Sequence, residues 1–347
     1  MKGSKNLKLF FLKNMAFVLF AVVFIIFGLL CKNWFTLTNF ENIARQSSYI
    51  GILAAGMTFV LLTGGVDLSV GANMFLSASI CGLLIVKGWP IWAAILICLL
   101  VGFLYGCFNA FFIVKIKVLP FVVTLATLMA GRGLTLIITK SEAVSMPASL
   151  VSGVGSGRLF GILPYPIVIF FLIVAAASIF LKFVPLGRQI YAVGKDAEGS
   201  KKAGINVNGV LAFVYIFNGV LAALAAIVSV TQIGNVTAGF GVGDEFNAIS
   251  ASILGGTSMM GGIGTIFPGA VIGVFLIQMV QAGLVYLQVD LYLQPIISAF
   301  IILFAVFLDS VRTRYIIKLE HRNIRTEEQV QKTQKGFTLR DLFDREK

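Results

Sequence analysis

Long apolar runs separated by short polar segments dominate this sequence. An apolar run of about twenty residues can cross a bilayer as a helix. Only 12% of the residues are charged and 58% are hydrophobic, and a soluble core cannot absorb that much apolar surface. The runs of sufficient length, about ten in number, are Asn14–Cys31, Gln46–Thr63, Leu68–Val86, Ile91–Val114, Leu119–Thr139, Ile162–Phe183, Val210–Gln232, Phe246–Met260, Ile266–Leu287 and Leu291–Leu308. We therefore predict an all-α integral membrane protein with about ten transmembrane helices. The eighth run is short and the second and third nearly merge, so a count one lower or one higher also fits.

The basic residues predict how these helices are oriented, because cytoplasmic loops carry an excess of lysine and arginine. Basic residues precede the first run and follow the fourth, sixth and tenth runs. With ten helices all of these positions fall on one side, so both termini are predicted to be cytoplasmic, and Lys140–Gly161 and Ile233–Glu245 face outward. This distribution also accounts for the net charge of +12 without nucleic-acid binding. We expect a basic cytoplasmic segment (1–13), a polytopic transmembrane domain (14–310) and a polar cytoplasmic tail (311–347).

The segment Val184–Val207, called the coupling segment below, is the one long polar stretch inside the apolar region. It follows the sixth run and contains several basic residues and glycines. The positive-inside rule places it in the cytoplasm. A membrane protein that exposes such a segment there offers a binding surface to a soluble partner.

The sequence lacks the motifs of an ATPase or of the common hydrolases. No GxxxxGK[ST] phosphate loop, HExxH zinc motif or GxSxG elbow occurs. The four cysteines show no CxxC spacing and are expected to be small apolar core residues. We therefore expect no catalytic residue, no metal and no cofactor, and a solute route that is either passive or driven by a partner.

Few polar side chains lie within the apolar runs, and each has two interpretations. Asp67 precedes a new apolar run, so it either caps a helix or contacts a solute at a gate. The uncharged groups of Ser69, Asn73, Asn218 and Gln278 either hydrogen-bond to neighbouring helices or line a route for a hydroxyl-rich solute. We predict these five residues as candidates for the translocation pathway.

Two glycine-rich segments, 63–71 and 254–265, allow two structures. They either form bends that line a water-accessible route or form close-packed crossings without solute contact. Arg132 also lies within an apolar run, and we expect it to reach a membrane face or to bond backbone carbonyls of a neighbouring helix.

Four motifs carry a family resemblance. They are GMTFVLLTGGVDLSVG at 56–71, PLGRQIYAVG at 185–194, AGIN at 203–206, and ILGGTS at 253–258 followed by Gly261 and Gly262. Together they resemble the permease subunits of bacterial ABC importers for ribose and related monosaccharides, and the likeness runs from about Asn14 to Asp309. It implies a multi-pass permease of the bacterial inner membrane that works with a second copy or a related subunit.

The resemblance also implies two protein partners. A cytoplasmic ABC ATPase would dock on the coupling segment, and a periplasmic or surface solute-binding protein would deliver the solute. The sequence departs from the family's coupling motif in the position of its acid, Glu198, and at Gly199 and Lys202. We predict ATPase coupling at Gly187, Arg188, Gly194, Asp196, Glu198, Lys201, Lys202 and Gly204, and docking of the solute-binding protein at Asp244 and Glu245.

Two other classes compete with an ATP-driven importer. An ion-coupled secondary transporter or channel for a small neutral solute would fit the apolar architecture, but the membrane region lacks the chain of acids and histidines of a proton relay. A lipid-directed membrane enzyme would need a nucleophile, an acid–base pair or a metal set, and none is found. The sequence therefore favours import of a sugar or sugar-like solute, in contact with membrane lipid and without nucleic acid.

Overall fold

The computed structural model describes residues 15–290, 292–297, 299–300, 303 and 307 of the chain. Contacts between residues group Ala16–Ala299 into one unit, to which the following description applies. Met1–Met15 and Phe300–Lys347 form a second unit, of which the described residues are Met15, Phe300, Leu303 and Phe307. The predicted terminal segments 1–13 and 311–347 lie outside the described residues.

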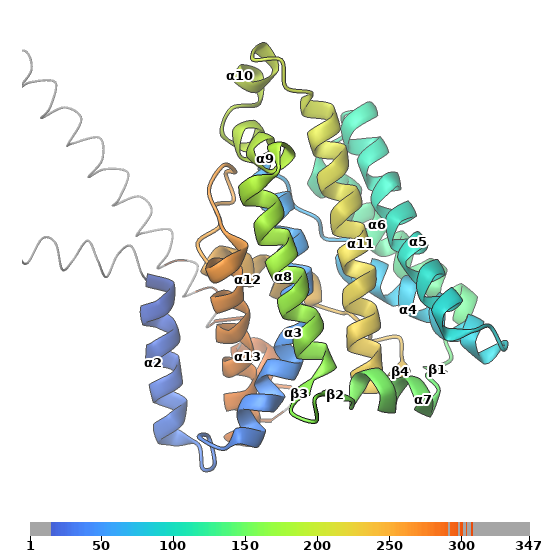
Figure 1. The fold of residues 1–347 in the computed structure, drawn as a ribbon, viewed down its shortest axis with the longest axis vertical. Helices are drawn as coiled ribbons and strands as arrows, with labels where there is room; N and C mark the ends of the chain where they lie inside the picture. The colour runs from blue at the N-terminus through green and yellow to red at the C-terminus, as the bar shows by residue number, and fades with distance from the viewer. Residues whose placement is uncertain (1–14, 291, 298, 301–302, 304–306, 308–347) are drawn as a thin grey trace, which may run out of the picture. The chain divides into compact units, whose positions relative to one another are not determined.

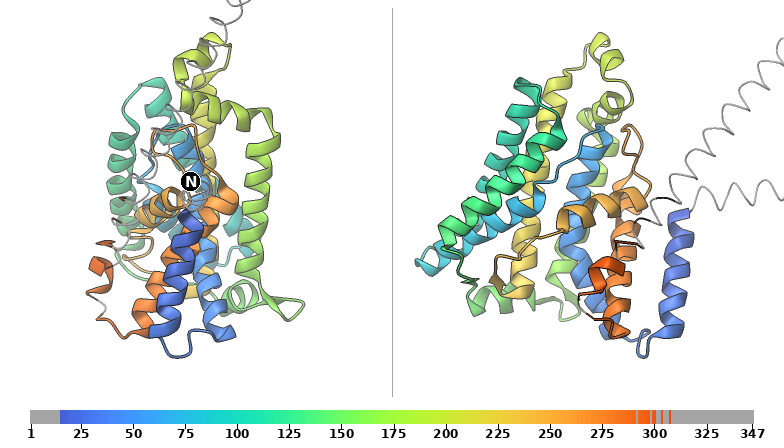
Figure 2. Two further views of the ribbon diagram at one scale, coloured as in Figure 1. Left: turned by 90° about the vertical axis from the view of Figure 1, so that its left-hand side faces the viewer. Right: turned by 180° about the vertical axis from the view of Figure 1, so that it is seen from behind.

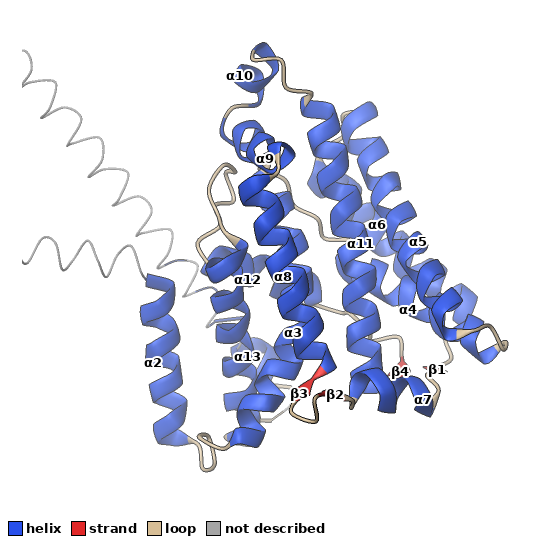
Figure 3. Ribbon diagram, viewed as in Figure 1, coloured by secondary structure: helices blue, strands red, loops and turns tan. Residues whose placement is uncertain are grey.

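Helices make up nearly all of the unit, and strands are limited to short pairs (Figure 1, Figure 3). The helices are α2 (Met15–Leu30), α3 (Leu37–Leu62), α4 (Val70–Val86), α5 (Ile91–Ala110), η1 (Phe111–Lys115), α6 (Pro120–Thr139), α7 (Ala148–Leu150), η2 (Val151–Gly155), α8 (Tyr165–Phe183), α9 (Pro185–Lys195), α10 (Ala197–Lys202), α11 (Val207–Ile233), α12 (Asp244–Leu254), η3 (Ile266–Ala270) and α13 (Val271–Tyr286). The all-α prediction is confirmed. Of the predicted tenth run, residues 294–297 are helical, and most of its second half lies outside the described residues.

Five helices among the described residues are long and apolar enough to cross a bilayer. They are Ile91–Lys115, Pro120–Thr139, Tyr165–Phe183, Val207–Ile233 and Ile266–Tyr286. Large apolar side chains cover their outer surfaces; for example, Leu96, Leu104 and Phe108 of α5 are 55–58% exposed. Apolar surface on this scale is suited to lipid rather than water. The prediction of a membrane protein is therefore confirmed, whereas the count of ten helices stays a prediction.

Helix α3 occupies the interior and is longer than the apolar run that predicted it. It begins at Leu37 rather than Gln46, after Thr36, whose hydroxyl accepts the Asn39 amide hydrogen at 3.3 Å. Its first part is too polar to be recognised by hydropathy, while its second half is buried among α8, α11, α12 and α13. A Cβ atom on Gly51 would lie 2.0 Å from the Phe170 ring of α8, so glycine permits this close packing.

Helices α4 and α12 are short and begin in buried surroundings. They have 17 and 11 residues. The predicted run Phe246–Met260 is wrong beyond Leu254, because residues 255–265 form turns and irregular chain. A Cβ atom on Gly255 would lie 2.3 Å from the backbone of Gly269. At this point the glycines allow one backbone to pack against another, as the close-packed interpretation predicts.

Two strand pairs mark one end of the unit. β1 (Val144–Ser145) pairs antiparallel with β4 (Asn235–Val236), and β2 (Arg158–Leu159) with β3 (Leu163–Pro164). The β1–β4 pair joins the two segments that the charge pattern predicts to face outward. Helices α9 and α10 lie at the opposite end of the unit (Figure 1, Figure 2). The two ends are named the β1–β4 end and the α9–α10 end below.

Candidate functional site

The coupling segment folds as two short helices rather than as a loop. Pro185 is the first residue of α9, where its missing N–H breaks no hydrogen bond. Asp196 separates α9 from α10, and its carboxylate accepts the Gly199 amide hydrogen at 2.9 Å. A Cβ atom at position 199 would lie 2.4 Å from Asp196 Oδ2. Gly199, one of the departures from the family motif, therefore leaves room for the Asp196 carboxylate that caps α10.

Helix α9 contacts the end of α3 and the glycine-rich segment 254–265. The Gly262 amide donates to the Leu62 carbonyl at 2.8 Å, and the Tyr191 hydroxyl donates to the Gly264 carbonyl at 2.8 Å. A Cβ atom on Gly194 would lie only 1.7 Å from the Leu62 oxygen. The end of α3, the segment before η3 and helix α9 thus meet at one point, so a shift of α9 is transmitted to both neighbours.

The predicted coupling residues form a packed group and an exposed group. Gly187 is buried, and a Cβ atom there would lie 2.5 Å from the Leu181 oxygen; Gly194 has the contacts just described. Gly204 follows α10 with a φ of +85°, a conformation that favours glycine. The charged members are all exposed and form no ion pair with another described residue: Arg188, Asp196, Glu198, Lys201 and Lys202. The α9–α10 end therefore presents an unpaired, mixed-charge surface.

Four of the five predicted pathway residues share one buried hydrogen-bond network. Asp67 Oδ1 accepts from the Ser69 amide at 2.9 Å and from its hydroxyl at 2.6 Å, and Asp67 Oδ2 accepts from Asn218 Nδ2 at 2.8 Å. Ser69 Oγ accepts from Asn109 Nδ2 at 2.8 Å. Asn73 Nδ2 donates to a backbone carbonyl of α11 at 3.0 Å. This polar network holds the segment before α4 against α5 and α11.

The geometry of the polar network favours the structural interpretation of Asp67. Both carboxylate oxygens accept hydrogen bonds from protein donors, and the side chains of the network are at most 2% exposed. A buried carboxylate satisfied in this way has no free oxygen directed at a solute. Gln278 is also 2% exposed but lies on α13 and takes no part in the network.

Asp244 and Glu245 lie at the amino terminus of α12, where acidic side chains are favourable. Glu245 is 5% exposed, and a Cβ atom on Gly71 of α4 would lie 2.4 Å from Glu245 Oε2. The Glu245 carboxylate is covered by neighbouring chain in this conformation, and its docking role stays a prediction. Asp244 is partly exposed, with Asn247 Nδ2 at 3.5 Å from its Oδ1, so its docking role stays a prediction.

Arg132 of α6 reaches the chain that leads into α12. Its Nη1 donates to the Phe240 carbonyl at 3.3 Å, and its guanidinium lies over the Phe75 ring, 5.9 Å from the centroid. Of the two expected structures, Arg132 thus bonds a backbone carbonyl, but this carbonyl belongs to the turn before α12 and not to a neighbouring helix.

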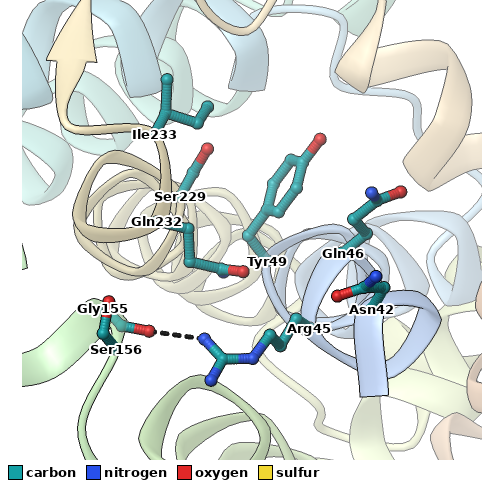
Figure 4. Close-up of a pocket in the computed structure, with 9 residues that line it drawn as sticks. All are labelled: Asn42, Arg45, Gln46, Tyr49, Gly155, Ser156, Ser229, Gln232 and Ile233. Carbon is teal, nitrogen blue, oxygen red and sulfur yellow. Dashed lines mark hydrogen bonds between the residues drawn. The ribbon is translucent and has the colours of Figure 1, made fainter. Parts of the chain in front are cut away.

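A polar pocket of about 340 Å³ opens between α3, η2 and α11 at the β1–β4 end (Figure 4). We call it the α3–α11 pocket. The α3 side chains recur at positions i, i+3, i+4 and i+7, which places them on one helix face. The main polar lining consists of Asn42, Arg45, Gln46 and Tyr49 from α3, and Ser229 and Gln232 from α11.

An ion-pair cluster holds the wall of this pocket. Arg45 Nη1 donates to the Gly155 carbonyl at 2.7 Å, and Arg45 Nε lies 2.9 Å from Glu41 Oε1. Arg158 of β2 makes a bidentate contact with Glu41, at 2.7 and 3.0 Å. Desolvation raises the pKa of Glu41. Arg158 and Arg45 lower this pKa by more, through their hydrogen bonds to the carboxylate and through their positive charges, so the pKa lies below its usual value.

The α3–α11 pocket was not predicted, because the second apolar run begins only at Gln46 and leaves out the first part of α3. The available signal was the polar spacing of Asn42, Arg45, Gln46 and Tyr49, which predicts one polar face on a helix that continues before the apolar run. The partner side chains Ser229 and Gln232 lie near the end of α11, and nothing in the sequence links them to residues 42–49.

Residues 39–306 match the family model described as "Branched-chain amino acid transport system / permease component". The chain belongs to this permease family. The ribose import permease RbsC of Haemophilus influenzae is 35% identical over 305 residues, which cover 87% of this chain and 94% of the relative. RbsC of Escherichia coli is 34% identical, with coverage of 87% and 95%. The autoinducer 2 import permease LsrC of Yersinia pseudotuberculosis is 34% identical over 326 residues, with coverage of 94% and 90%. No solved structure matches the chain.

Family membership and structure agree on the location of this permease. A permease component with several apolar helices of spanning length is a multi-pass protein of the inner membrane. The resemblance carried by the four sequence motifs is thereby confirmed.

Proposed function

We propose that this permease forms the membrane path of an ATP-driven ABC importer for a sugar or sugar-like solute. The relatives at 34–35% identity are named for the import of ribose and of autoinducer 2. The family description names branched-chain amino acids, but those relatives match at least 87% of the chain and are the closer guide to solute class. An ion-coupled transporter would leave the unpaired charged surface of α9 and α10 without a role.

The contact of α9 with the end of α3 and with the glycine-rich segment 254–265 is the observation that carries the proposal. ATP hydrolysis on a separate subunit can drive transport only if movement of the docking site reaches the membrane helices. Backbone contacts at Gly194, Leu62 and Gly262 provide that connection, because close-packed backbones cannot shift independently.

The mechanism follows from this connection. ATPase subunits dock on Arg188, Asp196, Glu198, Lys201 and Lys202 and move α9 and α10 when they close on ATP. That movement shifts the end of α3 and the segment before η3, and the route changes from one-sided to other-sided access. The permease holds the solute path and performs no chemistry on the solute.

The polar network and Gln278 receive positional roles in this proposal. Asp67, Ser69, Asn73 and Asn218 keep the chain before α4 fixed against α11 while α3 moves. Gln278 lies on α13, the helix that follows the segment contacted by α9, and is proposed to meet the route when that helix shifts.

The proposed membrane arrangement has about ten helices and both termini in the cytoplasm. The α9–α10 end then faces the cytoplasm and the β1–β4 end faces the solute-binding protein, with Asp244 as a docking acid. A second permease copy or a related subunit completes the route, and lipid covers the remaining apolar surface. The support is the clustering of the predicted outward segments at one end and of the coupling segment at the other.

Deletion of residues 196–203 tests the proposed function. The variant and wild type are placed in vesicles with the companion ATPase and solute-binding protein, and ATP-driven uptake of labelled D-ribose and a panel of other neutral sugars is measured. We expect uptake by the deletion variant to fall to background with normal membrane insertion. Asn208→Ala changes an exposed residue at the start of α11 and serves as the control that retains uptake. Wild-type uptake by the deletion variant would contradict the proposal.

A further inference from the structure

We infer that the α3–α11 pocket is an outer binding subsite for a small, neutral, polyhydroxylated solute. The inference rests on the proposed function and adds the place where the solute is held inside one permease subunit before it crosses. Neither the sequence motifs nor the polar network points to this place.

The size and position of the pocket fit such a role. Its volume of about 340 Å³ lies at the lower end of the range of small-molecule sites, roughly 300–1,000 Å³. It lies at the β1–β4 end, remote from α9 and α10 (Figure 1). In the proposed orientation this is the side on which the solute arrives.

The lining offers donors and acceptors that the protein itself leaves unused. Among the described residues, the side chains of Asn42, Gln46 and Tyr49 have no hydrogen-bond partner, although all three line the pocket. Gln232 uses its amide nitrogen on Ser48 Oγ and a backbone carbonyl, which leaves its carbonyl oxygen as an acceptor. Amides and a phenol can donate to and accept from the same solute, as the hydroxyl groups of a sugar require.

The charge distribution selects against an amino acid. Arg45 is the charged residue of the lining, and its guanidinium is engaged by Glu41 and by the Gly155 carbonyl. The Glu41 carboxylate is in turn shared with Arg158. An amino-acid ligand needs a free anionic group for its ammonium group, and the lining offers none. A neutral solute avoids the desolvation of an uncompensated charge.

The ion-pair cluster sets the distance between the two walls that meet at Arg45. Glu41 and Arg45 belong to α3, whereas Gly155 ends η2 and Arg158 begins β2. These contacts join segments that are 110 and 117 residues apart in sequence and thereby fix the width of the pocket. They use none of the amide groups that line it.

Cysteine protection tests this subsite without the ATPase. Gln46→Cys is introduced into the full-length permease in phosphatidylcholine vesicles, and its reaction with a membrane-impermeant maleimide is timed with and without D-ribose, D-galactose or ribitol. A neutral sugar or polyol at about ten times its half-protection concentration should slow the reaction about tenfold, because only the unoccupied pocket reacts. L-leucine should leave the rate unchanged.

Matched variants make the result decisive. Ser152→Cys lies in exposed η2 outside the pocket lining, and its reaction should be insensitive to every sugar. Asn42→Cys provides a second pocket position should Gln46→Cys insert poorly. The wild type gives the background from the native cysteines, of which Cys31, Cys81 and Cys98 are buried.

Three outcomes would contradict the subsite. The first is a maleimide reaction rate of both pocket variants that no neutral solute changes. The others are protection of the pocket variants by L-leucine, and protection of Ser152→Cys by a sugar to the same degree as the pocket variants. The proposed function is judged separately by ATP-driven uptake in the deletion experiment. Normal ATP-driven uptake without protection of the pocket cysteines would contradict the subsite alone. Protection without ATP-driven uptake would contradict the proposed importer function and support the subsite.

Discussion

The two ends of the permease are built from different kinds of contact. At the α9–α10 end, glycine allows backbones to touch and leaves no room for a side chain, as Gly194 against Leu62 and Gly262 shows. At the β1–β4 end, long polar side chains surround a cavity, and an ion-pair cluster keeps its walls apart. Closely packed backbones cannot move independently, so a displacement of one is passed to the other. Amide side chains without a protein partner are free to hydrogen-bond to a solute. The proposed roles follow this difference: the α9–α10 end receives the movement of the ATPase, and the β1–β4 end receives the solute.

Added volume at the point where the backbones of Gly194 and Leu62 meet should abolish transport. Gly194→Val places atoms against the Leu62 carbonyl, which cannot rotate away as a side chain would. Overpacking of this kind costs about 1–3 kcal/mol, and we expect ATP-driven uptake to be lost. Uptake and membrane insertion are measured together, with Gly133→Ala as the control, because a Cβ atom on Gly133 meets nothing within 4 Å. Full uptake by Gly194→Val would show that the contact transmits nothing.

A second change tests the polar network that holds the chain before α4. Asp67→Ala leaves the Ser69 amide and the Asn218 side chain without their acceptor in a buried site. Loss of hydrogen bonds to a buried carboxylate should lower the free energy of unfolding by about 3 kcal/mol, seen as a lower melting temperature of the purified protein. Exposed Asn208→Ala should leave the melting temperature unchanged. An unchanged value for Asp67→Ala would mean that the polar network contributes no stability.

A third change sharpens the description of the β1–β4 end. Gln46→Ala removes one amide from the α3–α11 pocket without touching the ion-pair cluster. One lost hydrogen bond is worth about 1 kcal/mol, so the solute concentration for half-maximal uptake should rise about fivefold with maximal rate retained. A fall in maximal rate at unchanged half-saturation would instead assign Gln46 to coupling.

The smallest expected effect concerns pH and the ion-pair cluster. Glu41 lies before the predicted membrane-spanning part of α3, and its folded-state pKa is below its usual value. Its stabilising contribution is therefore present above the unfolded-state pKa and is lost as the pH falls through the folded-state pKa. The melting temperature of Glu41→Gln should lie slightly below that of wild type at pH 7, corresponding to at most about 1 kcal/mol, and the difference should disappear in acid. A difference that grows in acid would contradict the assignment.

Hydropathy and charge predicted the helical membrane architecture because lipid imposes both patterns directly on the sequence. They failed where the end of a helix does not coincide with the end of an apolar run. The start of α3 carries exposed polar side chains such as Asn42 and Gln46, and α12 ends at Leu254 inside the predicted run, so hydropathy marks neither position.

The candidate sites show the same division. The coupling segment was found because a polar stretch between apolar runs is conspicuous, but its two helices depend on the cap at Asp196 and on contacts with Gly262. The α3–α11 pocket combines residues 42–49 with 229–233, and nothing in a single sequence links positions so far apart. The burial of Glu245 against Gly71 was likewise invisible, because the chain before α12 turns inward only in the folded protein.

Solute uptake into liposomes tests most directly whether a separate ATPase drives transport by this permease. The liposomes contain the purified permease, with the companion ATPase and solute-binding protein either present or omitted. With both companions and ATP, accumulation of the sugar against its gradient is expected. It should vanish when the ATPase is omitted or when Gly194→Val replaces the wild type. Uphill accumulation by the permease alone, driven by an ion gradient, would contradict the account.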